Sequence, residues 1–199
     1  MKNLIRENFR IKLNTCLFYE HPLDTWVKEE SKIPVSLRIL DINNISDPIL
    51  EKRFSIETLK KRLENGDKCF LTEKSGRLSS FHWLQTNGKH YIGPTGEWKD
   101  IQPGTAVIYH VFVEEKFRGN KINGMVYSEI LGYCKDNDID QVWIYTDSKN
   151  SANRKGLEKL GFKIYKQTCS LKFRHRYIFA NQNYFRFFNK AFTARIFTE

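Results

Sequence analysis

The run AVIYHVFV, from Ala106 to Val113, constrains the fold of this chain more than any other segment. A continuous series of β-branched and aromatic residues is typical of a strand that is buried on both of its faces. Apolar residues at helical spacing follow over 121–137, and a second apolar run, QVWIYT, spans Gln141 to Thr146. Two buried strands separated by a helix predict a sheet that carries crossover helices.

The remaining segments add elements on both sides of this unit. Ser55 is placed to cap a helix that ends at Asn65-Gly66, whereas residues 86–104, rich in glycine and proline, predict a long loop or irregular insertion. The other expected elements are strands over 36–41, 69–72, 78–84 and 162–173, and a helix over 151–160. The order β-α-β-β-β-α-β-α-β predicts an α/β (mixed α+β) fold, in which a central mixed sheet is flanked by helices.

A length of 199 residues accommodates one domain, which we expect over 35–173. Residues 1–34 are mixed in charge and loosely patterned, and they predict an N-terminal arm with a short helix. Residues 174–199 differ in composition, because they combine basic residues with many aromatic ones. We expect this basic aromatic C-terminal segment to pack on the domain.

The C-terminal segment carries a helical pattern of its own. Phe185, Phe188, Phe192 and Ile196 recur at spacings of three and four, so a helix would place them on one face. We expect that face to complete the core by packing against the sheet or the arm. Two alternatives stay open, namely peripheral contact with an anionic membrane and self-association through the same face. The sequence does not fix the oligomeric state.

Composition limits the classes of partner and of site. Lysine and arginine outnumber aspartate and glutamate by 33 to 23, and the net charge of +10 favours nucleic acid, an anionic membrane or a phosphorylated cofactor. The cysteines, at 16, 69, 134 and 169, lack the short spacings of a zinc site, so we expect no metal. No apolar run reaches the length of about 18 residues that spans a bilayer, and no secretory signal pattern is present, so we expect a cytoplasmic protein.

The junction between the central strand and its helix carries the chemistry. Here Arg118-Gly119-Asn120-Lys121-Ile122-Asn123-Gly124 leads directly into the helix. A glycine-containing loop at a helix start presents unpaired backbone N–H groups and the positive end of the helix dipole. Arg118 and Lys121 add positive charge, so this loop is suited to bind phosphate.

Two motifs together resemble those of the GNAT superfamily, the acyl-CoA-dependent N-acyltransferases. The loop from Arg118 to Gly124 is similar to the family motif Arg/Gln-x-x-Gly-x-Gly/Ala, and Asn150 with Leu160-Gly161-Phe162 matches the asparagine and the Leu-Gly-Phe that bound the family's last helix. The resemblance covers about 35–173. It implies the GNAT fold and acetyl-CoA, or another acyl-CoA, as co-substrate. It further implies that the strand end pairs with the pantetheine arm and the loop holds the pyrophosphate, which gives as cofactor-binding residues Val111, Phe112, Val113, Arg118, Gly119, Asn120, Lys121, Ile122, Asn123, Gly124 and Asn150.

The sequence departs from the family pattern at two places. Lys121 and Asn123 stand where the family usually has glycine or alanine, although asparagine tolerates positive φ and a lysine can pair with phosphate. Leu157 stands where many members have the tyrosine that protonates the departing thiolate. Another donor, water, or unassisted departure of a thiolate whose thiol has a pKa of about 8.5 must then serve.

Three residues are candidates for catalysis. His110 and Tyr109 are adjacent on the first strand and should face opposite sides, so only one of them is expected to face the acceptor. His110 has the more suitable pKa for taking a proton from the amine, and Tyr145 on the second strand can donate to sulfur. For all three, packing in the core is the alternative interpretation.

The leading hypothesis is an N-acyltransferase, most simply an N-acetyltransferase, that moves an acetyl group from acetyl-CoA to a primary amine in a direct ternary complex. Its partner would be a small-molecule amine that the sequence does not identify. The alternative is a GNAT-like module that binds CoA or acts as a scaffold without catalysis. No RNA or DNA motif supports a nucleic-acid partner, so we do not expect one.

Overall fold

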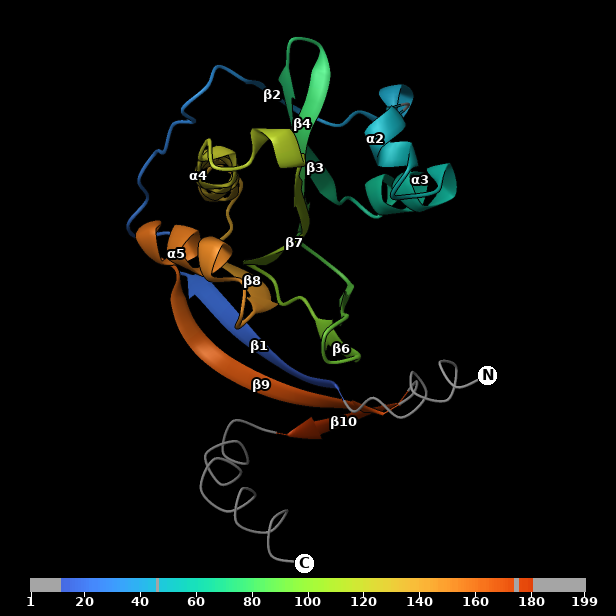
Figure 1. Ribbon diagram of the computed structural model, residues 1–199, viewed down its shortest axis with the longest axis vertical. Coiled ribbons are helices and arrows are strands. Elements are labelled where there is room, and N and C mark those ends of the chain that lie inside the picture. Colours follow the sequence, from blue (N-terminus) through green and yellow to red (C-terminus); the bar gives the residue numbers. More distant parts are fainter. Residues whose placement is uncertain (1–11, 46, 174–175, 181–199) are drawn as a thin grey trace, which may run out of the picture.

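The computed structural model describes residues 12–45, 47–173 and 176–180 (Figure 1). Its strands are β1 (Lys12–His21), β2 (Ser36–Ile39), β3 (Lys68–Lys74), β4 (Arg77–Gln85), β5 (Lys89–Ile92), β6 (Glu97–Asp100), β7 (Thr105–Val113), β8 (Gln141–Asp147), β9 (Lys163–Phe173) and β10 (Arg176–Ala180). The helices are η1 (Ile42–Asn44), α2 (Pro48–Glu51), α3 (Ile56–Glu64), η2 (Glu115–Phe117), α4 (Ile122–Lys135) and α5 (Ser151–Lys159).

Eight strands form one mixed sheet in the order β10-β9-β1-β8-β7-β4-β3-β2. Within the described ranges β7 and β8 pair in parallel, and every other adjacent pair of this sheet is antiparallel. α4 is the crossover that joins the parallel strands. α4 and α5 lie on one side of the sheet, and α2 and α3 lie on the other (Figure 1). The expected mixed α/β architecture is confirmed.

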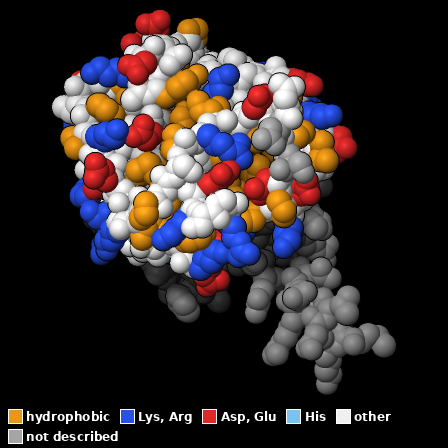
Figure 2. All heavy atoms as spheres, turned by 90° about the horizontal axis from the view of Figure 1, so that it is seen from above, with side chains coloured by type: hydrophobic (Ala, Val, Ile, Leu, Met, Phe, Trp, Pro, Cys, Tyr) orange, Lys and Arg blue, Asp and Glu red, His pale blue; other side chains and the backbone are white. Residues whose placement is uncertain are grey.

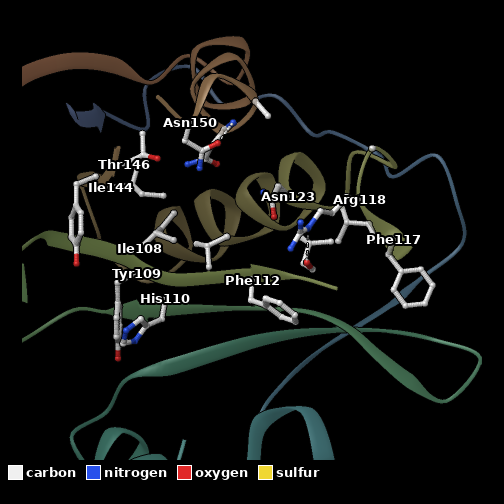
Figure 3. A pocket seen from close by; sticks show the side chains of 17 residues that line it. Ile108, Tyr109, His110, Phe112, Phe117, Arg118, Asn123, Ile144, Thr146 and Asn150 are labelled. Atoms are coloured by element: carbon white, nitrogen blue, oxygen red, sulfur yellow. Dashed lines mark hydrogen bonds between the residues drawn. The ribbon is translucent and has the colours of Figure 1, made fainter. Parts of the chain in front are cut away.

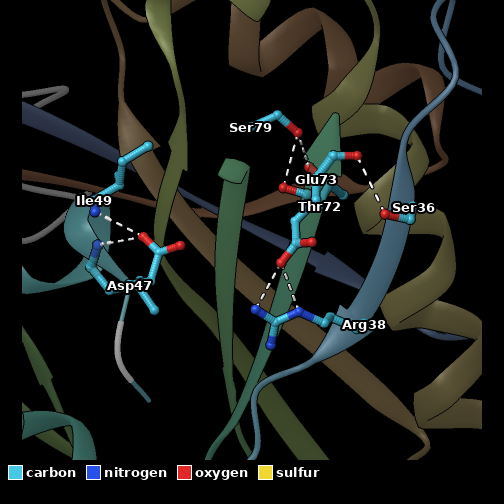
Figure 4. Close-up of polar contacts among 8 residues, drawn as sticks. Ser36, Arg38, Asp47, Ile49, Thr72, Glu73 and Ser79 are labelled. Carbon is cyan, nitrogen blue, oxygen red and sulfur yellow. Dashed lines mark hydrogen bonds and ion pairs between the residues drawn. The ribbon is translucent and has the colours of Figure 1, made fainter. Parts of the chain in front are cut away.

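Local chemistry explains where the short helices begin. The Ser55 hydroxyl accepts the Thr58 N–H at 3.2 Å and caps α3, as the sequence predicted. The Asp47 carboxylate accepts the N–H groups of Ile49 and Leu50 and caps α2 (Figure 4). These caps fix the start of both helices that cover this side of the sheet.

The outer strand β2 is held to β3 by a side-chain interaction as well as by the ladder. Both Nε and an NH2 nitrogen of Arg38 lie within 2.8 Å of one carboxylate oxygen of Glu73 (Figure 4). β2 has only four residues, so this ion pair supplements a short set of ladder bonds.

Residues 12–21 correct one prediction, because they form a strand where the sequence predicted part of an arm with a short helix. β1 lies between β8 and β9, with Cys16 opposite Asp147 and opposite Thr168. Its residues from Cys16 to Tyr19 are all at least 95% buried. The apolar run from Cys16 to Tyr19 is only four residues long, shorter than the run that identified β7, and so short a run does not distinguish a buried strand from a helical segment.

The segment 86–104 also differs from the expected loop. β5 and β6 form a two-stranded hairpin whose turn is closed by N–H groups of Thr95 and Gly96, both donating to the Ile92 carbonyl. Gly96 has a φ of +70°, which a glycine adopts without strain. The Ser170 hydroxyl donates to the Pro94 carbonyl at 2.7 Å, so the hairpin turn is attached to β9.

Apolar side chains fill three clusters on the two sides of the sheet. The largest lies between the sheet and α4 and α5, the second lies under α2 and α3, and the third lies under the β5–β6 hairpin. The outer face seen in Figure 2 carries basic and acidic side chains interspersed, so the excess positive charge does not collect in one patch there. Among the described helices, none has the length and apolar character required to cross a bilayer.

The buried position of β1 gives a testable consequence. Phe18 is 1% exposed and its ring lies 5.7 Å from that of Tyr145, so Phe18→Ala should lower the free energy of unfolding by about 3–5 kcal/mol. Urea denaturation measures this change. The matched control is Val27→Ala, at a side chain 65% exposed, which should change stability by less than about 0.5 kcal/mol. A Phe18→Ala protein as stable as the parent would contradict the position of β1.

Candidate active site

The strands β7 and β8 separate halfway along their length. They pair from Thr105 opposite Gln141 to Ile108 opposite Ile144, and no further pair follows although β7 continues to Val113. The backbone edges beyond Ile108 and Ile144 therefore face each other without a ladder. Unpaired strand edges of this kind are open to a ligand that supplies amide groups.

A bulge in β7 accompanies this separation. Against β4, Phe112 lies opposite Phe81 and Tyr109 lies opposite Trp83, so β7 has one more residue than β4 over this stretch. His110 lies in the bulge with a φ of +43°, a conformation that is uncommon for residues other than glycine. An extra residue of this kind bends a strand, and the ladder with β8 ends directly before the bulge, at Ile108.

The separation opens a cleft of about 680 Å³ (Figure 3). It reaches from the loop before α4 to the start of α5. Its lining comes from β7, β8, the loop, α4 and α5: Ile108, Tyr109, His110, Val111, Phe112, Val113, Phe117, Arg118, Gly119, Ile122, Asn123, Ile144, Tyr145, Thr146, Asn150, Ala152 and Asn153.

One end of the cleft is formed by the start of α4. The first-turn N–H groups of a helix have no acceptor within the helix, and Lys121 at the N-cap position provides no side-chain cap. The Arg118 Nε donates to the Val113 carbonyl at 3.2 Å, which holds the guanidinium beside the strand end. Free N–H groups, the helix dipole and a guanidinium together fit a pyrophosphate.

The side chain of Lys121 does not face this cleft. Its φ is +59°, in the left-handed region, and its Nζ lies 3.9 Å from the Glu29 carboxylate, which also pairs with Lys159. A Cβ added at Gly124 would lie 2.7 Å from the same carboxylate. Lys121 thus pairs with Glu29, and Gly124 leaves room for the Glu29 carboxylate. The expected pairing of Lys121 with phosphate is not what the structure shows.

Most of the sequence-predicted binding residues lie in the cleft. Those that line it are Val111, Phe112, Val113, Arg118, Gly119, Ile122, Asn123 and Asn150. The remaining three, Asn120, Lys121 and Gly124, belong to the same loop but do not line it. Asn120 supports the loop instead, because its Nδ2 donates to the carbonyls of Phe117 and Arg118.

All three predicted catalytic residues line the cleft, but the expected opposition of Tyr109 and His110 is wrong. Their rings lie 5.4 Å apart and point to the same side of β7, away from Asn123 and Asn150 (Figure 3). The bulge explains this, because positive φ at His110 interrupts the alternation of side chains along the strand. Both rings thus lie on the side of the sheet covered by α3, where Tyr109 is buried and His110 is exposed.

His110 is a neutral imidazole at physiological pH. Partial burial, and then the nearby Arg62 guanidinium, lower its pKa to about 4. Its ring lies 5.6 Å from that of Phe54. An unprotonated imidazole is a hydrogen-bond acceptor and a possible base.

Sequence reasoning missed two neighbours of these residues. His90 of β5 is 4% exposed, and its Nε2 lies 3.1 Å from the Tyr145 hydroxyl. Burial, with smaller effects of His110 and Arg62, lowers the His90 pKa to about 4. The buried Asp67 accepts a hydrogen bond from the Tyr109 hydroxyl, and burial raises the Asp67 pKa. These contacts join the hairpin and α3–β3 segments to the site, and no local motif marks them.

Leu157 lies in the core rather than in the cleft. It is fully buried in the cluster beneath α5, so this position supplies no proton donor. Burial raises the pKa of Tyr145 to about 12, which keeps its hydroxyl protonated. In the part of the chain that the structure describes, no group of three His, Cys, Asp or Glu side chains is placed to hold a metal ion.

Comparison with known proteins agrees with this geometry. Residues 38–162 match the model of the Acetyltransferase (GNAT) family. This chain belongs to that family. A mycothiol acetyltransferase of Thermobispora bispora is 29% identical over 115 residues, which are 55% of this chain and 36% of that protein. The chain thus spans about a third of the length of the curated relatives it matches.

Solved structures show the same fold. A GCN5-related N-acetyltransferase from Sphaerobacter thermophilus superposes with a TM-score of 0.56 at 15% identity, over 85% of this chain and 54% of that one. A Bacillus subtilis acetyltransferase in complex with CoA gives a TM-score of 0.50 at 14% identity, over 65% of this chain and 77% of that one. The GNAT fold is thereby confirmed.

The lowered pKa values predict a pH response that NMR can follow. Burial lowers the pKa of His82 to about 3, and His90 and His110 have values of about 4. Their imidazole signals should therefore not titrate between about pH 8 and 5.5, whereas those of the unfolded chain should titrate near about 6.5.

The sign of the accompanying stability change follows from proton uptake. Between about pH 6.5 and 4 the unfolded chain binds protons at these imidazoles that the folded chain does not, so stability is lost as the pH falls through this window. A midpoint near 6.5 for any of the three in the folded protein would show that its ring is solvated.

Proposed function

We propose that this chain is an N-acetyltransferase that moves an acetyl group from acetyl-CoA to a primary amine within a direct ternary complex. The observation that carries the proposal is the cleft between the separated strands β7 and β8, which ends at the uncapped start of α4 beside Arg118. Membership of the GNAT family, and acetyltransferase relatives, support acetyl transfer in general. The amine acceptor and the direct mechanism are our proposal.

In this mechanism the chain binds acetyl-CoA along the strand edges. The free edge of β7 at Val111–Val113 would pair with the amides of the pantetheine arm, and Arg118 with the α4 N–H groups would hold the pyrophosphate. Acetyl-CoA supplies an acetyl group activated as a thioester. The thioester would then lie near Ile108 and Ile144, where the two strands part.

His110 is suited to remove the proton that the amine must lose. Because its pKa is about 4, the imidazole is unprotonated at neutral pH and accepts a hydrogen bond, directly or through water, from the incoming amine. As the C–N bond forms and the C–S bond breaks, that proton passes from nitrogen to the His110 imidazole, directly or through water, and the CoA thiolate departs. Tyr109, on the same side, would orient the amine, since its hydroxyl is fixed by Asp67.

The tyrosine that is absent at position 157 has one candidate replacement. The Tyr145 hydroxyl lines the cleft from β8 and is held by His90. The neutral His90 ring donates from Nδ1 to Gln85 Oε1, so its Nε2 accepts the Tyr145 hydroxyl proton. To donate a hydrogen bond to the departing sulfur, the Tyr145 hydroxyl would turn from His90 to the thiolate, and a thiol pKa of about 8.5 also permits departure without a full proton transfer. Tyr145 therefore stabilises the leaving group in this scheme.

The alternative is a GNAT-like module that holds CoA without catalysis, and one assay separates the two. Release of free thiol from acetyl-CoA is measured across a panel of primary amines, and acetylated products are identified by mass spectrometry. Amine-dependent thiol release supports the enzyme. Binding of CoA without turnover of any amine supports the module, and absence of CoA binding would exclude both.

The site of the pyrophosphate is tested at Arg118. Arg118→Ala should weaken acetyl-CoA binding by about ten- to hundredfold, because a charge-assisted hydrogen bond contributes about 1.5–3 kcal/mol. Isothermal calorimetry measures the affinity. The control is Arg77→Ala, at an exposed residue that begins β4 and lies outside the cleft. Equal affinity in the parent and Arg118→Ala would exclude Arg118 from the site.

The role of His110 is tested with asparagine, which tolerates the positive φ of the bulge and removes the imidazole. His110→Asn should lower turnover of the amine found in the screen by about 10²-fold, at the lower end of the usual contribution of a general base, because a pKa of about 4 makes the imidazole a weak base. Affinity for acetyl-CoA should change by less than about twofold, because His110 lies on the other side of β7 from the loop. Unchanged turnover would assign His110 to packing.

A further inference from the structure

Three asparagine side chains line the cleft, and each has its oxygen occupied by the protein. Asn123 Oδ1 lies 3.1 Å from His82 Nε2, Asn153 Oδ1 accepts the Tyr127 hydroxyl at 2.9 Å, and Asn150 Oδ1 accepts the Asn153 N–H at 3.2 Å. Among the described residues, none accepts a hydrogen bond from the three Nδ2 groups. The cleft wall thus carries three carboxamides whose oxygen atoms already accept hydrogen bonds and whose NH2 groups remain as donors.

The donors that hold these oxygens are buried. His82 of β4 and Tyr127 of α4 are both fully buried, and their rings meet edge to face at 5.3 Å. Because a carbonyl oxygen carries no hydrogen, the His82–Asn123 contact requires the proton to be on His82 Nε2. His82 Nδ1 is buried without a hydrogen-bond partner among the described residues, so no acceptor there favours the tautomer that carries the proton on Nδ1.

The two asparagines held by this pair belong to different helices, α4 and α5. Asn123 lies in the first turn of α4, beside Arg118, and Asn150 begins α5 with Asn153 one turn later (Figure 3). Asn123 stands where related loops have glycine or alanine, so the chain has added a side-chain donor at the proposed pyrophosphate position. An acyl-CoA offers acceptors for such donors, namely phosphoryl oxygens near α4 and amide carbonyls along the pantetheine arm.

We propose that His82 and Tyr127 fix the carboxamides of Asn123 and Asn153 so that their NH2 groups donate to acyl-CoA, Asn123 to the pyrophosphate and Asn153 to a pantetheine carbonyl. This inference rests on the proposed function, since it assumes that acyl-CoA occupies the cleft. Asn123 and Asn153 are binding residues, and His82 and Tyr127 are positioning residues that do not touch the ligand.

Calorimetry with CoA tests the two binding residues. Asn123→Ala should weaken CoA binding by about ten- to hundredfold, as expected for a bond to a charged phosphate, and Asn153→Ala by about two- to tenfold. Pantetheine, followed by ligand-observed NMR, separates the two contacts. Asn153→Ala should weaken pantetheine binding, whereas Asn123→Ala should leave it unchanged. An Asn123→Ala protein that binds CoA as the parent does would overturn the inference.

Double variants test positioning. His82→Phe should weaken CoA binding when it is introduced into the parent protein, but it should have no further effect when it is added to Asn123→Ala. Tyr127→Phe should behave in the same way toward Asn153→Ala. Tyr133→Phe removes a hydroxyl from the same helix away from the cleft and should leave affinity unchanged. Additive effects of the two changes in a pair would show that the buried residue acts only on stability.

The outcomes separate this inference from the proposed function. If the parent binds CoA and the four single variants bind it equally, the amide contacts are wrong and the acetyltransferase proposal stands. If the parent does not bind CoA, both fail. Melting temperatures verify folding, and if His82→Phe does not fold, His82→Gln replaces it. That variant retains an N–H donor and should bind CoA within about threefold of the parent, whereas a loss as large as that of Asn123→Ala would overturn the positioning role.

Discussion

The extra residue of β7 at His110 is the constraint on which the site depends. A residue other than glycine at a φ of +43° costs about 1–3 kcal/mol, and such a conformation persists only where the surrounding structure imposes it. Here the fully buried Trp83 lies opposite Tyr109 on one side of the bulge, and Phe81 lies opposite Phe112 on the other. These packed pairs fix the register of β7 on both sides of the extra residue, so the bend has to occur at His110.

The cleft beside this bend has two chemically different sides. Toward α4 and α5 it is lined by backbone edges and by amide donors, with Arg118 beside the helix start. Toward α3 and the β5–β6 hairpin it is lined by the rings of Tyr109 and Tyr145 and by the neutral imidazole of His110, whose pKa is lowered by burial and by Arg62. The first side suits an anionic ligand rich in acceptors. The second side would suit the amine of the proposed function, because the neutral imidazole of His110 can accept a proton from it.

The sequence alone predicted those features that depend on residues close together in the chain. The cap at Ser55, the helix α4, and the loop and asparagine motifs were predicted from neighbouring residues. β1 could not be recognised as a strand, since its apolar run from Cys16 to Tyr19 is too short to distinguish a buried strand from a helical segment. The bulge at His110 depends on the register between β7 and β4, and the contacts of His90 and Asp67 join segments distant in the chain. Information of that kind exists only once the sheet has formed.

The departures from the family loop illustrate the same principle. Lys121 occupies a left-handed position that favours glycine, but its ammonium group pairs with Glu29, which approaches α4 closely because Gly124 has no side chain. Asn123 replaces a second small residue, and His82 from the neighbouring strand β4 holds its oxygen. Each substitution is therefore matched by a residue outside the motif. As a sequence motif the loop is degenerate. In the fold it keeps the uncapped start of α4, and Asn123, whose carboxamide is oriented by His82, replaces a small residue.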